Sequence, residues 1–191
     1  PDIRLAGIAA LAPATQLPDI FGAVKDQPVG KIMGSYVLSA YAAAYPDVRA
    51  RDYVRPAATV LVNETAGRCL SGPEALVSVA ANAPTPPIFR RDPATGALGQ
   101  RLAENIPTGK IAAPLWIAQG QSDALVLPRL QAAYIKARCE DGQRLAYRTY
   151  PGLDHVGLVL NPQSAAVPDL LAWTKQRLSG AKQRSGCNLG P

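Results

Sequence analysis

The chain has 191 residues, of which 48% are hydrophobic and 18% charged, a composition typical of a globular protein with one sizeable core. Lysine and arginine exceed aspartate and glutamate by 6, but the basic residues are scattered and form no basic stripe, so nucleic-acid binding is not expected. The apolar stretches are too short to cross a membrane, and no basic-then-apolar leader opens the sequence, which leaves the protein's location open.

The first residues form a short apolar run between Arg4 and Pro13, without alternation of polar and apolar positions. Such a run is typical of a strand that is buried on both faces of a parallel sheet. We therefore expect residues 1–19 to contribute a core strand of the sheet, and we expect this strand's neighbours on one side to lie outside the chain.

The pattern changes after this first strand. Residues 31–45 form an apolar, alanine-rich stretch that stops at Pro46, and residues 73–82 form a second one that starts with a proline, where helices tolerate it. Residues 83–89 are too rich in proline for a central helix or strand. Residues 20–108 are therefore predicted to be a helical insertion.

Strand and helix patterns alternate in the last part of the chain. Residues 111–119 and 144–150 are predicted to be strands, and residues 128–139 and 168–178 are predicted to be helices. This alternation is typical of a parallel sheet with right-handed crossovers. The predicted fold class is α/β, and residues 109–191 form the C-terminal part of its core.

The chain has a single histidine, His155, in a loop directly after the second of these predicted strands, and Asp123 follows the first. Ligands bind such sheets at the carboxyl ends of the strands. A strand-end carboxylate followed one βα unit later by a loop histidine is also the order of acid and base in α/β serine hydrolases. Asp123 and His155 are therefore the candidate catalytic pair, whereas the adjacent Asp154 is expected to face solvent.

Other interpretations of the two residues stay open. Residues 120–124 partly match the Gly-x-Ser-x-Gly nucleophile motif, with Ser122 at the centre and alanine in the last place. A nucleophile there would leave too little chain before His155 for the strand that carries the acid. Asp123 can instead be a plain helix-capping residue, and a lone histidine is often an ordinary surface or core residue.

A nucleophile is missing from the expected position. The serine of a nucleophile elbow needs glycine two positions before and two positions after it, to allow a strained turn. None of the serines upstream of Ser122 meets this condition, namely Ser35, Ser39, Ser71 and Ser78. The nucleophile is therefore expected outside this chain.

Three cysteines, Cys69, Cys139 and Cys187, form neither a CxxC motif nor a Cys/His cluster, so a zinc site is not expected. Cys139 closes a predicted helix and Cys187 lies in the tail, so a disulfide between them would pin the C-terminus to the core. On the chain-entropy model such a bridge contributes about 4 kcal/mol. Free thiols are the alternative, and Cys69 has no assigned partner.

These residues resemble a known family, the secretory lipases of actinobacteria and fungi related to Candida antarctica lipase A. The similarity is to the C-terminal half of that family, and it rests on residues 112–120 with Asp123 and Val126, on Arg138, Cys139 and Gly142, on residues 150–152 with His155, and on Trp173 and Cys187. Residues 1–10 with Ala12 and Pro13 resemble the strand that follows the family's nucleophile helix.

The resemblance implies a partial α/β-hydrolase fold in which residues 20–108 are a helical cap or lid. It implies secretion, hydrolysis of carboxylic esters including acylglycerols, contact with a lipid interface, and no cofactor or metal. Asp123 would be the triad acid and His155 the general base. The serine and the oxyanion-hole donors would belong to a missing N-terminal half.

Apolar cap residues are candidates for the wall of an acyl pocket, with ordinary packing as the alternative: Ile32, Met33, Tyr36, Val37, Ile88 and Phe89. A second hypothesis for the whole chain belongs to a different class. It is a non-catalytic hydrolase-like module that binds an apolar ligand or a partner through an open sheet edge.

Overall fold

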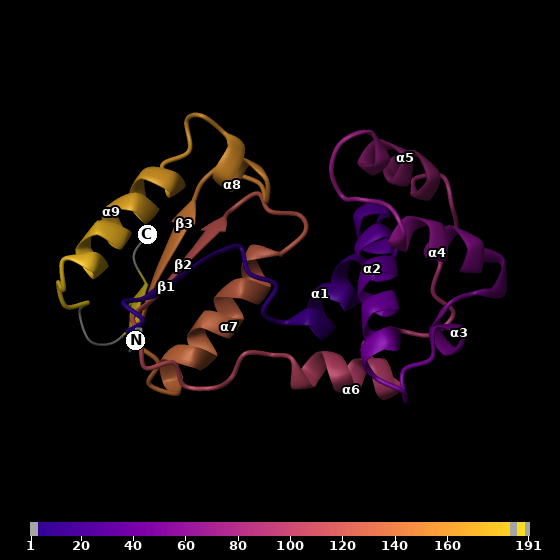
Figure 1. Cartoon of the computed structure of the whole chain (residues 1–191), viewed down its shortest axis with the longest axis horizontal. Helices are drawn as coiled ribbons and strands as arrows, with labels where there is room; N and C mark the ends of the chain where they lie inside the picture. Colours follow the sequence, from indigo (N-terminus) through magenta and orange to yellow (C-terminus); the bar gives the residue numbers. More distant parts are fainter. Residues whose placement is uncertain (1–3, 184–186, 190–191) are drawn as a thin grey trace. The chain divides into compact units, whose positions relative to one another are not determined.

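A computed structural model describes residues 4–183 and 187–189 (Figure 1). The chain divides into two compact units: an α/β unit, made of the residues up to Thr15 and those from Pro107 onward, and a helical unit, Gln16–Ile106. Within the described residues no helix is long and apolar enough to span a membrane.

The α/β unit contains one parallel sheet with its strands in chain order, β1 (Ile8–Leu11), β2 (Leu115–Gly120), β3 (Leu145–Tyr150) and β4 (Cys187–Leu189). The predicted α/β class is confirmed. The first two strands are shorter than the apolar runs that predicted them. The last strand was not predicted, because its three residues are too few to show a period.

Helices flank the sheet on both sides. Figure 1 shows α7 (Pro128–Glu140) on one side of the strands and α9 (Ala166–Leu178) on the other, with the short α8 (Gly157–Leu160) near the end of the strands. Every residue of β2 is buried, and Trp116 faces α9, where its ring centroid lies 6.4 Å from that of Trp173. Burial on both faces explains why the first four residues of this strand are apolar.

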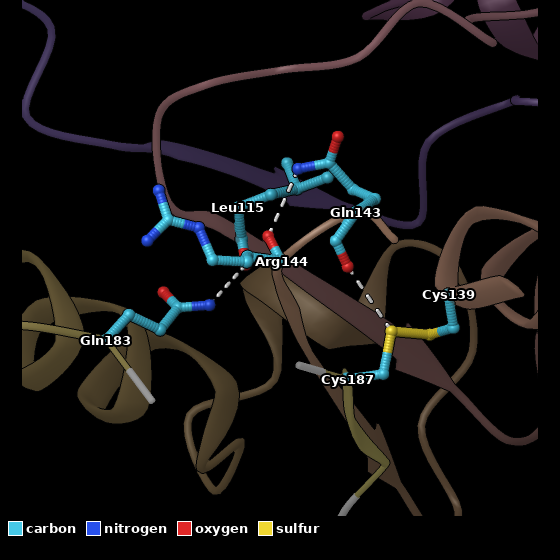
Figure 2. Close-up of a disulfide and its surroundings, with 6 residues drawn as sticks. All are labelled: Leu115, Cys139, Gln143, Arg144, Gln183 and Cys187. Atoms are coloured by element: carbon cyan, nitrogen blue, oxygen red, sulfur yellow. Dashed lines mark hydrogen bonds between the residues drawn. A yellow bond between two sulfur atoms is a disulfide. The ribbon is translucent and has the colours of Figure 1, made fainter. Parts of the chain in front are cut away.

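A disulfide joins Cys139, near the end of α7, to Cys187, the first residue of β4 (Figure 2). Beside it the buried Gln143 pairs with the main chain of Ile111, because its Oε1 accepts the Ile111 N–H and its Nε2 donates to the Ile111 carbonyl, both at 2.9 Å. Of the two alternatives for these cysteines, the structure has the bridge, and Cys69 is an exposed free thiol. Strand β4 is thus attached covalently to α7.

The helical unit comprises, in its described residues, α1 (Leu17–Val24), α2 (Pro28–Ala44), α3 (Ala50–Tyr53), the 3-10 turn η1 (Pro56–Ala58), α4 (Thr59–Ala66), α5 (Pro73–Asn82) and α6 (Gly96–Glu104). Its own core includes Phe21, Leu38, Tyr53, Ile88, Phe89, Leu98 and Leu102. The core lies around α2, whose Gly34 allows close contact with the Phe89 ring.

Packing accounts for several of the residues that were candidates for an acyl pocket. Ile88 and Phe89 are buried in the core of the helical unit, with exposed fractions of 1% and 6%. Tyr36 donates a hydrogen bond from its hydroxyl to the carbonyl of Arg68 at 2.5 Å. These three side chains hold helices and loops of the unit together, and the lid role of the unit stays a prediction.

Candidate active site

The two candidate residues lie in loops at the same edge of the sheet. Asp123 follows β2 and His155 follows β3, and these strands are adjacent and parallel, with Gly120 opposite Tyr150. Since the carboxyl ends of parallel strands meet at one edge, the loops start side by side.

Main-chain contacts tie the two loops together. The Gln121 N–H donates to the Tyr150 carbonyl at 3.0 Å, and the Ser122 N–H donates to the Leu153 carbonyl at 2.9 Å. A Cβ atom on Gly120 would collide with the same Leu153 carbonyl oxygen, so glycine is needed for this close approach. The loops therefore form one connected layer at the strand ends.

His155 and Asp123 are hydrogen-bonded, with 2.9 Å between Nδ1 and Oδ2. The Asp123 side chain is fully buried, whereas 36% of the His155 side chain is exposed. With the carboxylate ionised, Nδ1 carries the proton and Nε2 has a free lone pair. Nε2 makes no hydrogen bond within residues 4–183 and 187–189, so it is available to a reacting group.

Hydrogen bonds keep the buried carboxylate charged. Asp123 Oδ1 accepts the N–H groups of Leu125 and Val126 at 2.9 and 2.8 Å, and Oδ2 accepts the Gln119 amide at 3.0 Å in addition to His155. Burial alone would raise the pKa of Asp123, but the bonds from His155, Val126 and Leu125 outweigh it and hold this pKa below its ordinary value. The group is therefore an anion at neutral pH.

The pKa of His155 is raised above its ordinary value. The hydrogen bond to Asp123 is the largest cause, burial opposes it, and the charges of Asp123 and Asp154 add to it. Asp154 is exposed, as expected, and accepts the N–H of Gly157 at 2.6 Å at the start of α8. Its charge therefore acts on His155 from a distance while its side chain serves the local turn.

The structure does not support the two competing interpretations of this loop. Helix α7 begins at Pro128, and its N-cap residue is Leu127, so Asp123 closes a turn in the preceding loop instead of capping the helix. A nucleophile elbow holds its serine in a strained turn. Among the described non-glycine residues only Ala12 has a positive φ, 43°, so Ser122 is not in such a turn.

Sequence reasoning missed the third member of the cluster. Gln119 is fully buried in β2 and donates to Asp123, but a glutamine at the end of an apolar run carries no signal of this contact. Among the described residues no group of three histidine, cysteine or acidic side chains is placed to hold a metal ion.

This arrangement has a defined chemical capacity. A partly exposed imidazole with a free Nε2, held in one tautomer by a buried carboxylate, can take a proton from a nucleophile and return it to a leaving group. A parallel sheet that presents these groups after successive strands, with flanking helices, is a partial α/β-hydrolase fold.

The fold is similar to that of Candida antarctica lipase A. An X-ray structure of this lipase in its closed state matches the chain with a TM-score of 0.70 and 17% identity, over 95% of this chain and 44% of the lipase. A second X-ray structure of the lipase matches with a TM-score of 0.67 and 16% identity, over 93% of this chain and 43% of the lipase. The predicted resemblance is thus confirmed for the fold.

The chain spans less than half the length of these two structures. No family model matches the chain, and no curated protein matches it.

Proposed function

We propose that the chain is the acid- and base-bearing part of a serine hydrolase that cleaves carboxylic esters, acylglycerols among them. One observation carries this proposal: His155 Nδ1 lies 2.9 Å from a fully buried Asp123 carboxylate at the carboxyl ends of adjacent strands. The lipase fold supports the same reaction class.

In this reaction His155 Nε2 accepts the proton of a serine hydroxyl as the serine oxygen attacks the ester carbonyl. The same nitrogen then gives the proton to the departing alcohol, while Asp123 stabilises the imidazolium. Backbone N–H groups that hold the oxyanion typically contribute about 3 to 4 kcal/mol of transition-state stabilisation per donor.

The serine and these donors are proposed to lie in a polypeptide segment upstream of Pro1. The half-buried strand β1 stands at the end of the described sheet, so its outer side is open for a strand of that segment. The helical unit is proposed as the lid, in transient contact with a lipid interface. Secretion is also proposed, because the Cys139–Cys187 disulfide is compatible with an oxidising compartment.

Hydrolysis of short p-nitrophenyl esters tests this function. We expect the chain alone to be inactive, and a protein extended upstream to include a Gly-x-Ser-x-Gly segment to be active. His155→Ala should abolish the activity of the extended protein. Turnover by the isolated chain would mean that the nucleophile has been misplaced, and full activity of the His155→Ala variant would refute the general base.

The open edge of β1 also favours a second candidate, a non-catalytic module that binds a partner along this strand. The upstream coding sequence separates the two. A Gly-x-Ser-x-Gly motif in frame within a few tens of residues of Pro1 supports the enzyme, and a start codon with a leader directly before Pro1 supports the module.

A further inference from the structure

Gln119 occupies an unusual position next to the candidate pair. Its side chain is fully buried, and its Nε2 lies within hydrogen-bond distance of three oxygens, namely Asp123 Oδ2 at 3.0 Å, the Val126 carbonyl at 3.0 Å and the Gly120 carbonyl at 3.2 Å. All three atoms are acceptors. The amide must therefore turn its NH2 group toward them, since the opposite orientation would bring its oxygen against a carboxylate and two carbonyls.

In this orientation the oxygen of the amide has no hydrogen-bond donor in the residues that the structure describes. Gln119 Oε1 is buried and has no hydrogen-bond partner among the described residues. A buried acceptor without a partner costs free energy, about 1 to 3 kcal/mol. An apolar residue would avoid that cost and suit a buried strand, so packing alone does not explain a glutamine here.

Gln119 contacts Asp123 Oδ2 directly and is linked to Oδ1 through Val126. Its amide and the His155 ring donate to the same atom, Oδ2. Its bond to the Val126 carbonyl holds the residue whose N–H donates to Oδ1. The strand thereby closes the loop 120–126 around the carboxylate, and the charge on Oδ2 is divided between two donors.

We propose that Gln119 is a positioning residue of the candidate active site, which shares the negative charge of Asp123 Oδ2 with His155 and anchors the loop that holds Oδ1. This role adds a residue to the proposed hydrolase site, and its importance for catalysis rests on the proposed function. A neutral donor beside His155 limits how strongly the carboxylate favours the imidazolium, so the base stays able to accept a proton near neutral pH. In the described part of the chain, the charges that act on the ring come from Asp123 and Asp154.

The test uses the isolated chain and needs no ester hydrolysis. Because His155 is the single histidine, a nuclear magnetic resonance titration of the imidazole reports its pKa directly. Gln119→Met keeps the length of the side chain and removes the donor. We expect the measured pKa of His155 to rise by about half a unit to one unit, because a hydrogen bond to the charged carboxylate is lost.

Two further variants make the titration decisive. Gln121→Met is the matched control, because Gln121 is exposed and, among the described residues, its side-chain amide donates only to Thr149 Oγ1, at 3.1 Å. The pKa of His155 should not change in this variant. Asp123→Asn should lower this pKa, since the partner charge is gone. No fall in the Asp123→Asn variant would refute the pair itself, and with it the proposed function.

A separate result would refute the role of Gln119 without refuting the Asp123–His155 pair. An unchanged pKa of His155 in Gln119→Met, or a fall toward the ordinary histidine value, would show that Gln119 acts only in packing. If this variant does not fold, the unaltered chain still decides the question. The side-chain NH2 resonances of Gln119 should then shift with the same midpoint as His155, because both groups bind Oδ2; NH2 resonances that stay constant through the titration would overturn the proposal.

Discussion

Both units bury polar side chains, but they do so with different results. In the α/β unit the buried Gln119 donates to the buried Asp123, and Asp123 is hydrogen-bonded to His155, whose side chain remains 36% exposed. In the helical unit the buried Lys31 and Asn82 are bound by main-chain carbonyls and hydroxyls of the unit itself. A buried polar network becomes a candidate active site only where it ends in an exposed reactive atom.

In the helical unit, the polar network around the buried Lys31 connects two helices. Lys31 is 3% exposed, and its ammonium group donates to the carbonyls of Asn82 and Thr85, the first of them at 3.0 Å. Asn82 is the last residue of α5, where helix carbonyls lack partners and a cation is favourable. The network therefore attaches α2 to the end of α5, and we assign it a structural role.

The largest effect is expected from replacement of Asp123, the buried acid of the α/β unit. In the upstream-extended protein, Asp123→Asn should lower kcat by about 10⁴, because the imidazole loses its correct tautomer and its counter-charge. Ester hydrolysis measures this change. Asp154→Asn is the matched control, and it should keep kcat within about tenfold, since the exposed Asp154 charge is screened. Similar losses in the two variants would mean that the burial of Asp123 has no catalytic meaning.

The disulfide should stabilise one unit and not the other. Replacing Cys139 and Cys187 with serine opens a loop of 48 residues, which on the chain-entropy model costs up to about 4 kcal/mol in the free energy of unfolding. Both tryptophans, Trp116 and Trp173, lie in the α/β unit, so their fluorescence during urea unfolding reports this unit alone.

Cys69→Ser, in the helical unit, serves as the control and should leave the fluorescence transition unchanged, because Cys69 is exposed and free. The prediction fails if the double serine variant unfolds at the same urea concentration as the unaltered chain.

A smaller loss is expected from Lys31→Met, which removes the ammonium group and retains the apolar stem. Carbonyls of Asn82 and Thr85 lose a charged donor, so the helical unit should lose about 2 kcal/mol of stability. Far-ultraviolet circular dichroism should show that the helical unit unfolds at a lower urea concentration, while the tryptophan fluorescence transition of the α/β unit stays unchanged.

Lys136→Met, in α7 of the α/β unit, is the control for loss of a lysine charge, because the Lys136 side chain is 77% exposed. It should change the stability of its own unit by no more than about 0.5 kcal/mol and leave the unfolding of the helical unit unchanged. Equal effects of the two lysine variants would contradict a structural role of the buried ammonium group.

The dependence of stability on pH should be the smallest effect, and it should differ between the units. The raised pKa of His155 stabilises the folded α/β unit fully below about pH 6.5, and this contribution is lost as pH rises through the folded pKa. The lowered pKa of Asp123 contributes above about pH 3.9 and is lost as pH falls through its folded pKa.

The α/β unit should therefore lose stability above about pH 6.5, whereas the helical unit, which has no histidine, should show no such step. Urea unfolding at a series of pH values, followed by the two spectroscopic signals, measures the difference. The step should vanish in His155→Gln, and its persistence there would assign it to another group.

Local patterns predicted much of this architecture. The α5 helix has the predicted bounds, because Pro73 starts it and the proline-rich segment after Asn82 cannot continue it. Asp123 and His155 could be assigned to one edge of the sheet because parallel strands end together. These features follow from short-range sterics and from strand direction, and both can be predicted from neighbouring residues in the sequence.

Tertiary structure decided the rest. Gly34 is a weak position in a helix by propensity, but here the absence of a Cβ admits the Phe89 ring. Strand β4 forms beside β3, where the disulfide attaches it. Lys31 and Gln119 are polar residues that a sequence places at the surface by default. Their burial depends on acceptors that only the folded loops and helix ends bring together, because a buried polar group is tolerated only where distant segments supply its hydrogen bonds.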